Sequence, residues 1–215
     1  MTDERSFDRL RSVAGDVSRE TFERLLAFEK AFRRWSQRIN LAAPSTLESL
    51  WERHILDSAQ LSSLAPAALR WIDLGSGGGF PGAVTAILLK ERTGSRIALV
   101  ESNRKKASFL QTTLAELDVS SEIHASRIED ARISFEAEIV TARALAPLNR
   151  LIGLAMPWLS NGARALFHKG RDYRTEIEES AQRWTFDLIE HRSVIEPESV
   201  ILEIANPSPI DGRTD

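Results

Sequence analysis

The segment 71–82 carries the residues whose types and spacing most clearly indicate chemistry. It contains five glycines within its last eight positions, from Gly75 to Gly82. Glycines leave no side chain between the backbone and a ligand, and they let the chain turn tightly. A strand that runs into such a loop, followed by a helix, is typical of a cofactor site at the carboxyl end of a parallel sheet. A plain tight turn gives a similar pattern, so the loop alone does not decide.

Three residues around this loop make the cofactor interpretation more specific. Asp73 lies two residues before the first glycine, where its carboxylate can orient the loop through hydrogen bonds. Pro81 stands near the start of the following helix, where its missing N–H costs little. Glu101 ends the next predicted strand, and a carboxylate there can accept hydrogen bonds from both hydroxyls of a ribose. We therefore expect the loop to hold a cofactor that contains a nucleoside.

Two kinds of cofactor use this geometry, the nicotinamide dinucleotides and S-adenosylmethionine. The spacing is Asp-x-Gly-x-Gly-x-Gly from Asp73 onward, whereas dinucleotide sites favour Gly-x-Gly-x-x-Gly. A P-loop is excluded, because no Gly-Lys-Ser or Gly-Lys-Thr follows the glycines. We expect S-adenosylmethionine, and a nicotinamide oxidoreductase is a distant alternative.

The composition indicates a folded globular chain without a metal. Of 215 residues, 42% are hydrophobic and 27% are charged, and the net charge is −3. A net charge of −3 does not indicate a polyanion partner, although a local basic patch can still bind nucleic acid. Cysteine is absent and the four histidines are scattered, so we expect neither disulfides nor a metal site. The longest apolar stretch, Leu151–Leu159, is too short to span a bilayer, and we expect a cytoplasmic protein without a membrane partner.

The pattern of apolar residues changes near Pro66. Before it, the residues from Phe22 to Ile39 recur at helical spacing, and Ser45–Glu48 resembles a capping box that opens another helix. After it, short β-like runs alternate with amphipathic segments. The chain is therefore expected to divide into an N-terminal helical extension (1–66), a methyltransferase domain (67–206) and a flexible tail (207–215).

The second part of the chain is predicted to form a sheet with helices on both faces. The predicted strands cover 70–74, 96–100, 122–125, 137–141, 163–168, 186–192 and 200–205, and the predicted helices cover 82–91, 104–117, 148–159 and 173–184. Alternating strands and helices favour a parallel sheet, and the last two strands, with no helix between them, favour an antiparallel pair. We expect an α/β, Rossmann-like class I methyltransferase fold with a seven-stranded, mostly parallel sheet.

Six short motifs then occur in order along the chain. They are Ile39-Asn-Leu41, Arg53-His54-Ile-Leu-Asp57-Ser58, Asp73–Gly82, Val100-Glu-Ser102 followed by Lys105 and Phe109-Leu110, Ser126-Arg-Ile-Glu129-Asp130, and Ala142-Arg143-Ala144. Together they resemble the bacterial ribosomal RNA small-subunit methyltransferase G family, formerly called glucose-inhibited division protein B. The resemblance covers roughly residues 28–170 and is most specific where the His-Ile-Leu-Asp-Ser segment is combined with Gly-Phe-Pro-Gly.

The resemblance implies an activity and a set of cofactor contacts. The family transfers a methyl group to nitrogen-7 of one guanosine in the 530 loop of 16S rRNA, at position 527 of the usual rRNA numbering. The backbone around Gly75 and Phe80 should then hold the methionine part of the cofactor, with Gly77 leaving room for it. Ile128 and Glu129 should lie beside the adenine. The implied partner is 16S rRNA or the small ribosomal subunit.

Arg143 is expected to bind the cofactor at the sheet edge where cofactor and acceptor meet. It follows the fourth predicted strand, where a guanidinium can grip a carboxylate or phosphate; a surface ion pair with Glu138 is the alternative. Four further residues are expected on the acceptor side. His54 and Asp57 lie three apart, so they are adjacent on a helical face and either line the acceptor pocket or pair structurally. Lys105 and Lys169 flank loops at the sheet edge and are expected to meet RNA phosphates.

The expected chemistry needs no general base. Nitrogen-7 of guanine offers a lone pair and loses no proton on methylation, so positioning is the main requirement. The Asn/Asp-Pro-Pro-aromatic motif of amino methyltransferases is missing, because this position reads Thr141-Ala-Arg143-Ala. A small-molecule methyltransferase and a non-catalytic rRNA-binding assembly factor remain as alternatives.

Overall fold

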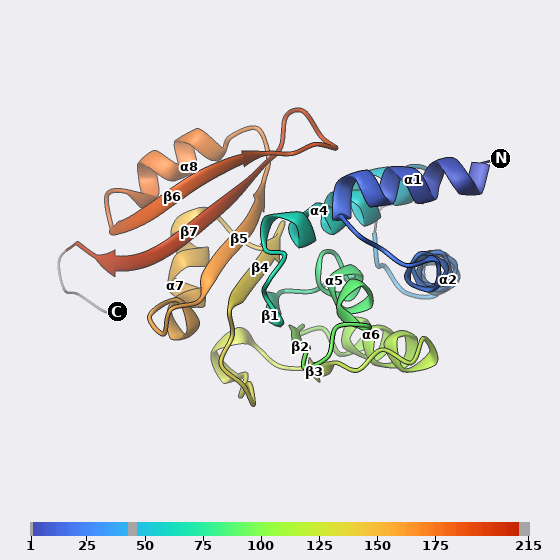
Figure 1. The fold of residues 1–215 in the computed structure, drawn as a ribbon. Coiled ribbons are helices and arrows are strands. Elements are labelled where there is room, and N and C mark those ends of the chain that lie inside the picture. The colour runs from blue at the N-terminus through green and yellow to red at the C-terminus, as the bar shows by residue number, and fades with distance from the viewer. Residues whose placement is uncertain (1, 43–46, 211–215) are drawn as a thin grey trace.

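The computed structural model of the chain describes residues 2–42 and 47–210, and it contains one seven-stranded sheet. The strand order is β3-β2-β1-β4-β5-β7-β6 (Figure 1). The strands are β1 (Arg70–Leu74), β2 (Arg96–Val100), β3 (Glu122–His124), β4 (Ile139–Arg143), β5 (Arg164–Lys169), β6 (Trp184–Arg192) and β7 (Val200–Pro209). The first five strands pair in parallel, and β7 runs antiparallel between β5 and β6, which confirms the expected sheet.

Several strand ends differ by a residue or more from the sequence prediction, and the differences in β4 and β7 matter most. β4 lies two residues later than predicted, so Arg143 is its last residue instead of following it. β7 continues to Pro209, four residues past its predicted end and into the segment expected as a tail. β5 pairs with β7 only as far as Ile204, so the later prolines interrupt no hydrogen bonds to β5, while β6 still pairs with that end of β7.

Helices cover both faces of the sheet (Figure 1). They are α1 (Thr2–Ala14), α2 (Arg19–Ser36), the π-helix η1 (Trp51–Leu56), α4 (Asp57–Leu64), α5 (Gly82–Leu89), α6 (Arg104–Glu116), the 3-10 turn η2 (Ile128–Asp130), α7 (Leu148–Leu159) and α8 (Tyr173–Ser180). α8 is shorter than predicted because β6 already begins at Trp184. None of the described helices is long and apolar enough to cross a bilayer.

The N-terminal helices begin and end at recognisable signals. Ser18 caps α2 by accepting a hydrogen bond from the backbone N–H of Thr21 at 3.0 Å. The predicted capping box at Ser45–Glu48 begins outside the described residues. After it, the chain forms the wide π-helical turn η1, which continues directly into α4.

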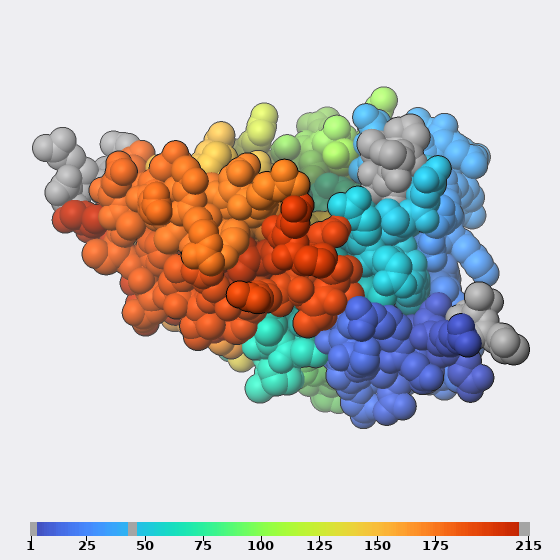
Figure 2. Space-filling model, turned by 90° about the horizontal axis from the view of Figure 1, so that it is seen from above, coloured from blue at the N-terminus to red at the C-terminus, as the bar shows by residue number. Residues whose placement is uncertain are grey.

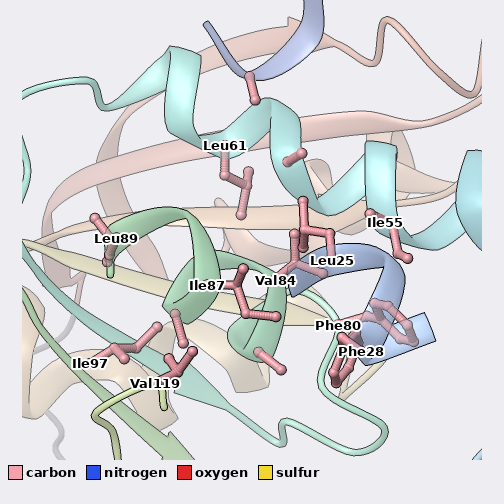
Figure 3. Close-up of a cluster of buried hydrophobic side chains, with 14 of the residues drawn as sticks. Leu25, Phe28, Ile55, Leu61, Phe80, Val84, Ile87, Leu89, Ile97 and Val119 are labelled. Carbon is pink, nitrogen blue, oxygen red and sulfur yellow. The ribbon is translucent and has the colours of Figure 1, made fainter. Parts of the chain in front are cut away.

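Alternation along the strands sorts the core into two layers. Trp71 faces the layer that holds α2, α4, α5 and α6, whereas Ile72 and Leu74 face α7 and α8. In the first layer, Phe28 of α2 lies beside Phe80, and the same cluster contains Val84 and Ile87 of α5 with side chains from η1 and α4 (Figure 3). The N-terminal helices therefore share one continuous hydrophobic core with the sheet.

We expect Phe28→Ala to lower the free energy of unfolding by about 3–5 kcal/mol, because Phe28 is fully buried and the change leaves a cavity. Val194→Ala is the control, because the Val194 side chain is 60% exposed and its loss should change stability by less than about 0.5 kcal/mol. Urea unfolding of both variants measures the two values. Equal effects would show that α2 contributes no more to the core than a surface loop does.

Candidate functional site

The glycine loop between β1 and α5 is held from below by a buried carboxylate. Asp73 accepts hydrogen bonds from the Gly82 backbone N–H at 3.1 Å and from the Thr141 hydroxyl at 2.7 Å. A Cβ at Gly82 would lie only 2.4 Å from the Asp73 Oδ2, so this close approach requires glycine. Burial raises the pKa of Asp73 to about 6, and the hydrogen bonds from Thr141 and Gly82 oppose that rise. Asp73 therefore fixes the start of α5 without reaching the surface.

A second carboxylate holds the loop from the side. Glu101, directly after β2, accepts hydrogen bonds from the backbone N–H groups of Gly77 and Asn103, each at 2.7 Å. Glu101 is only 8% exposed. Each carboxylate oxygen can accept more than one hydrogen bond, so Glu101 keeps acceptor capacity for a ligand.

A cavity of about 530 Å³ opens above this loop. That volume is typical of a site for a small molecule or cofactor. Seven of the eight residues predicted to contact a cofactor line it: Gly75, Gly77, Phe80, Glu101, Ile128, Glu129 and Arg143. The eighth, Asp73, lies beneath the loop and does not line the cavity. We refer to this space as the first cavity.

The Phe80 ring is packed mainly among other aromatic side chains of the core. Its ring packs against Phe28 and Phe32 with centroid separations of 5.7 and 5.2 Å, and the residue is only 8% exposed. The His54 ring lies 5.2 Å away, and the Arg143 guanidinium lies 5.3 Å from the ring centroid. Phe80 thus connects the core beneath α2 to the polar wall of the first cavity.

A second cavity of about 710 Å³ adjoins the first, and His54 and Arg143 line both. Asp57 and Lys169 also line the second cavity, so three of the four residues predicted on the acceptor side come together there. Lys105 does not; it is exposed in the first turn of α6 and lines neither cavity.

Arg143 forms an ion pair, but with a different partner from the alternative considered in the sequence. Its Nη1 donates to the Asp57 carboxylate at 3.2 Å, and its Nη2 donates to His54 Nδ1. Glu138 instead accepts hydrogen bonds from the backbone N–H groups of Leu69 and Arg70. Because Arg143 ends β4 and Asp57 begins α4, the pair joins the sheet to the helical extension at the boundary of the two cavities.

The π-helical turn η1 places His54 and Asp57 at this boundary. His54 lies within η1, and Asp57 donates its backbone N–H to the His54 carbonyl where α4 begins. π-helical turns are rare and often occur at functional sites. Sequence periodicity predicted an ordinary helical face here and did not indicate the wider turn.

Asp57 also has partners that the sequence did not suggest. Its Oδ1 accepts a hydrogen bond from Gln60 Nε2 at 2.7 Å and from the Ser193 hydroxyl at 3.3 Å. The Gln60 Oε1 accepts a hydrogen bond from the Val194 backbone N–H at 3.1 Å. The loop between β6 and β7 therefore packs on α4, and in Figure 2 its red atoms lie against the cyan and blue N-terminal helices. No motif in the sequence marks Gln60 or Ser193.

His54 is neutral at physiological pH. Its burial and the positive charge of Arg143 lower the pKa of His54 to about 4, and the Asp57 carboxylate opposes this only in part. A neutral ring also fits the contact with Arg143, because Nδ1 must accept the guanidinium hydrogen bond. His168 lies behind this group with Nε2 3.0 Å from the Asp57 carbonyl oxygen, and burial lowers the pKa of His168 as well.

Lys169 does not present a free cation. Its ammonium donates to Glu176 at 2.6 Å and to the Ala146 carbonyl at 2.8 Å, and the residue is 8% exposed. The neighbouring Arg171 pairs with Glu198 at 2.6 Å. Within residues 2–42 and 47–210, no group of His, Asp or Glu side chains is arranged to hold a metal ion.

Comparison with known proteins identifies the family. Residues 21–203 match the family model described as rRNA small subunit methyltransferase G, or GidB. The chain belongs to this family. It is 63% identical over 201 residues to the ribosomal RNA small subunit methyltransferase G of Chelativorans sp. strain BNC1, covering 93% of this chain and 96% of that protein. The protein of the same name from Brucella canis is 59% identical, covering 93% and 94% of the two chains.

Solved structures of other methyltransferases share the fold of this chain. An O-methyltransferase from Streptomyces achromogenes, solved in complex with SAM, superposes with a TM-score of 0.57 at 17% identity, covering 96% of this chain and 99% of that one. A SAM-dependent O-methyltransferase from Thermotoga maritima superposes with a TM-score of 0.55 at 14% identity, covering 87% and 73%. At these identities the likeness confirms the class I methyltransferase fold.

We expect Gly77→Val to reduce S-adenosylmethionine affinity at least tenfold, or about 1.4 kcal/mol. Gly77 has a φ of +54° and lines the first cavity, so a valine there adds backbone strain and a side chain beside the ligand space. Gly94→Val is the matched control, because Gly94 has a φ of +81° and lies outside both cavities. Calorimetric titration should show weaker binding only for Gly77→Val. Equal affinity in the two folded variants would remove the glycine loop from the cofactor site.

The lowered pKa of His54 predicts a pH-dependent stability difference. As pH falls from about 6.5 to about 4, His54 in the unfolded chain takes up a proton that the folded chain resists, so folding becomes less favourable. The unfolding free energy of the wild type minus that of His54→Gln should therefore decrease over this interval and stay level above pH 7. Urea titrations at several pH values measure the difference; a constant difference would show that His54 titrates normally.

Proposed function

We propose that the chain transfers the methyl group of S-adenosylmethionine to nitrogen-7 of a guanosine in the 530 loop of 16S rRNA. The observation that carries this proposal is the pair of adjoining cavities at the carboxyl edge of the sheet. The first has the glycine loop and Glu101 expected of a cofactor site, and the second meets it at His54 and Arg143. A cofactor in one cavity and a base in the other would meet at that shared wall.

The residues of the first cavity fit the parts of S-adenosylmethionine. Glu101 would accept the ribose hydroxyls, and the backbone at Gly75 and Gly77 would lie against the methionine part. Ile128 offers an apolar surface and Glu129 a hydrogen-bonding group to the adenine. When bound, the cofactor supplies an electrophilic methyl group on its sulfonium.

The acceptor side needs groups that position a base, because nitrogen-7 already carries a free lone pair. His54 is neutral and its Nδ1 is occupied by Arg143, so His54 is arranged to pack and orient. Asp57 holds Arg143 at the wall, and Lys169, neutralised by Glu176, shapes the far side of the second cavity. Holding two reacting atoms in line is sufficient for this transfer.

We further propose a two-part organisation of the chain and a cytoplasmic location. We assign residues 1–66 to a helical extension and 67–206 to the methyltransferase domain, with the acceptor bound between them. Lys105, exposed beside the first cavity, would contact phosphate. The partner would be 16S rRNA or the small ribosomal subunit in the cytoplasm, with no metal and no membrane taking part.

Mapping of methylated guanosines in rRNA tests this function. A strain that lacks the gene should lose nitrogen-7 methylation at one guanosine of the 530 loop, and the wild-type gene should restore it. Gly77→Val should not restore it, whereas Gly94→Val should. Full methylation of that guanosine in the deletion strain would contradict the proposal. Restoration by Gly77→Val would instead favour a non-catalytic role in subunit assembly.

A further inference from the structure

Basic side chains at the carboxyl edge of the sheet differ in how their charge is balanced. Those that line the second cavity all form ion pairs: Arg53 with Glu196 at 2.6 Å, Arg143 with Asp57 at 3.2 Å, and Lys169 with Glu176 at 2.6 Å. Each of these charges is thus balanced by a carboxylate of the same chain. The second cavity offers little to attract a polyanion.

The first cavity is lined by the carboxylates of Glu101 and Glu129, but it also contains cations without a carboxylate partner. Lys106, Arg127 and Arg150 line it, and none of them forms an ion pair with any residue that the structure describes. Arg127 and Arg150 are exposed, and Lys106 is half-buried. α6 and α7 cover opposite faces of the sheet, so Lys106 and Arg150 approach the mouth of the first cavity from its two sides.

The first turn of α6 strengthens this positive region. It consists of Arg104, Lys105 and Lys106 and contains no acidic residue. The N-terminus of a helix already carries partial positive charge, so three cations there repel it and each other. Such an arrangement is stabilised when an external anion binds. Elsewhere on the described surface many arginines are paired, for example Arg24 with Glu91 and Arg96 with Glu122.

The cofactor itself does not account for these charges. S-adenosylmethionine carries one carboxylate, balanced by its own ammonium group, and a positive sulfonium. Glu101 and Glu129 line the same cavity, but neither forms an ion pair with Lys106, Arg127 or Arg150, so these cations remain available to a further anion. A nucleic-acid backbone supplies one phosphate per nucleotide and binds through such contacts.

We infer that rRNA backbone lies across the mouth of the first cavity, with phosphates on Lys106 and Arg150. This inference rests on the proposed function and adds an order of binding. RNA in that position covers the opening through which the cofactor passes. S-adenosylmethionine therefore enters before RNA, and the product S-adenosylhomocysteine leaves only after the RNA has moved away.

The test compares release of radiolabelled S-adenosylhomocysteine from the enzyme with and without small ribosomal subunits from a strain that lacks the gene. Saturating subunits should slow release at least tenfold. The double variant Lys106→Gln/Arg150→Gln should lose most of that slowing, and the salt dependence of its subunit affinity should flatten by about 1.4–1.8 in log–log slope for two lost contacts. Arg171→Gln is the control, since Arg171 is already paired with Glu198 and should change neither.

Three results would overturn the inference. The first is equal release with and without bound subunits, and the second is an unchanged salt slope in the double variant. The third is a weaker affinity of the subunit-free double variant for S-adenosylhomocysteine, which would mean that the two side chains contact the cofactor. If the wild-type enzyme methylates subunits, the proposed function stands whichever of these results is obtained. Failure to bind or methylate subunits would instead overturn the proposed function itself.

Discussion

The ion pair between Arg143 and Asp57 is the contact on which the arrangement of both cavities depends. It is mostly buried, with side-chain exposures of 17% and 9%, so neither charge is left well hydrated. Removing one partner of a buried pair leaves the other uncompensated, which typically costs about 3–5 kcal/mol. The pair is therefore maintained both by the attraction between its charges and by the cost of separating them. It places a guanidinium at the end of β4, against the His54 ring and above Phe80.

The two carboxylates around the glycine loop work in a complementary way. Asp73 fixes where α5 begins, and Glu101 ties the middle of the loop to the start of α6. Glu101 accepts hydrogen bonds from two backbone N–H groups, and Asp73 accepts one from the Gly82 N–H and one from the Thr141 hydroxyl, so backbone donors that a glycine loop would otherwise leave without a partner are satisfied. The loop is thus shaped before any ligand arrives, and less ordering has to accompany binding. Preorganisation of this kind suits a reaction that depends on positioning.

Much of the fold and of the cofactor side could be predicted from the sequence, because their signals are local. Apolar alternation gives the strands to within a few residues, and the spacing of Asp73, the glycines and Glu101 indicates the first cavity. The partner of Arg143 could not be predicted in this way. Asp57 lies 86 residues earlier, and the pairing depends on the shift of β4 by two residues and on a π-helical turn. Likewise, the sequence predicts Lys169 as a free cation, and only the structure shows its ion pair with Glu176.

The contact of the β6–β7 loop with α4 also has a consequence for when the protein becomes complete. Ser193 follows Asp57 by 136 residues and Val194 follows Gln60 by 134, so the two sides of this contact are synthesised far apart in time. A nascent chain that has emerged only as far as β5 already contains the glycine loop, Glu101 and Arg143. It still lacks the hydroxyl and backbone groups that orient Asp57 and Gln60. The wall between the cavities can therefore be completed only once the β6–β7 loop has been synthesised, after all residues of the cofactor side are already present.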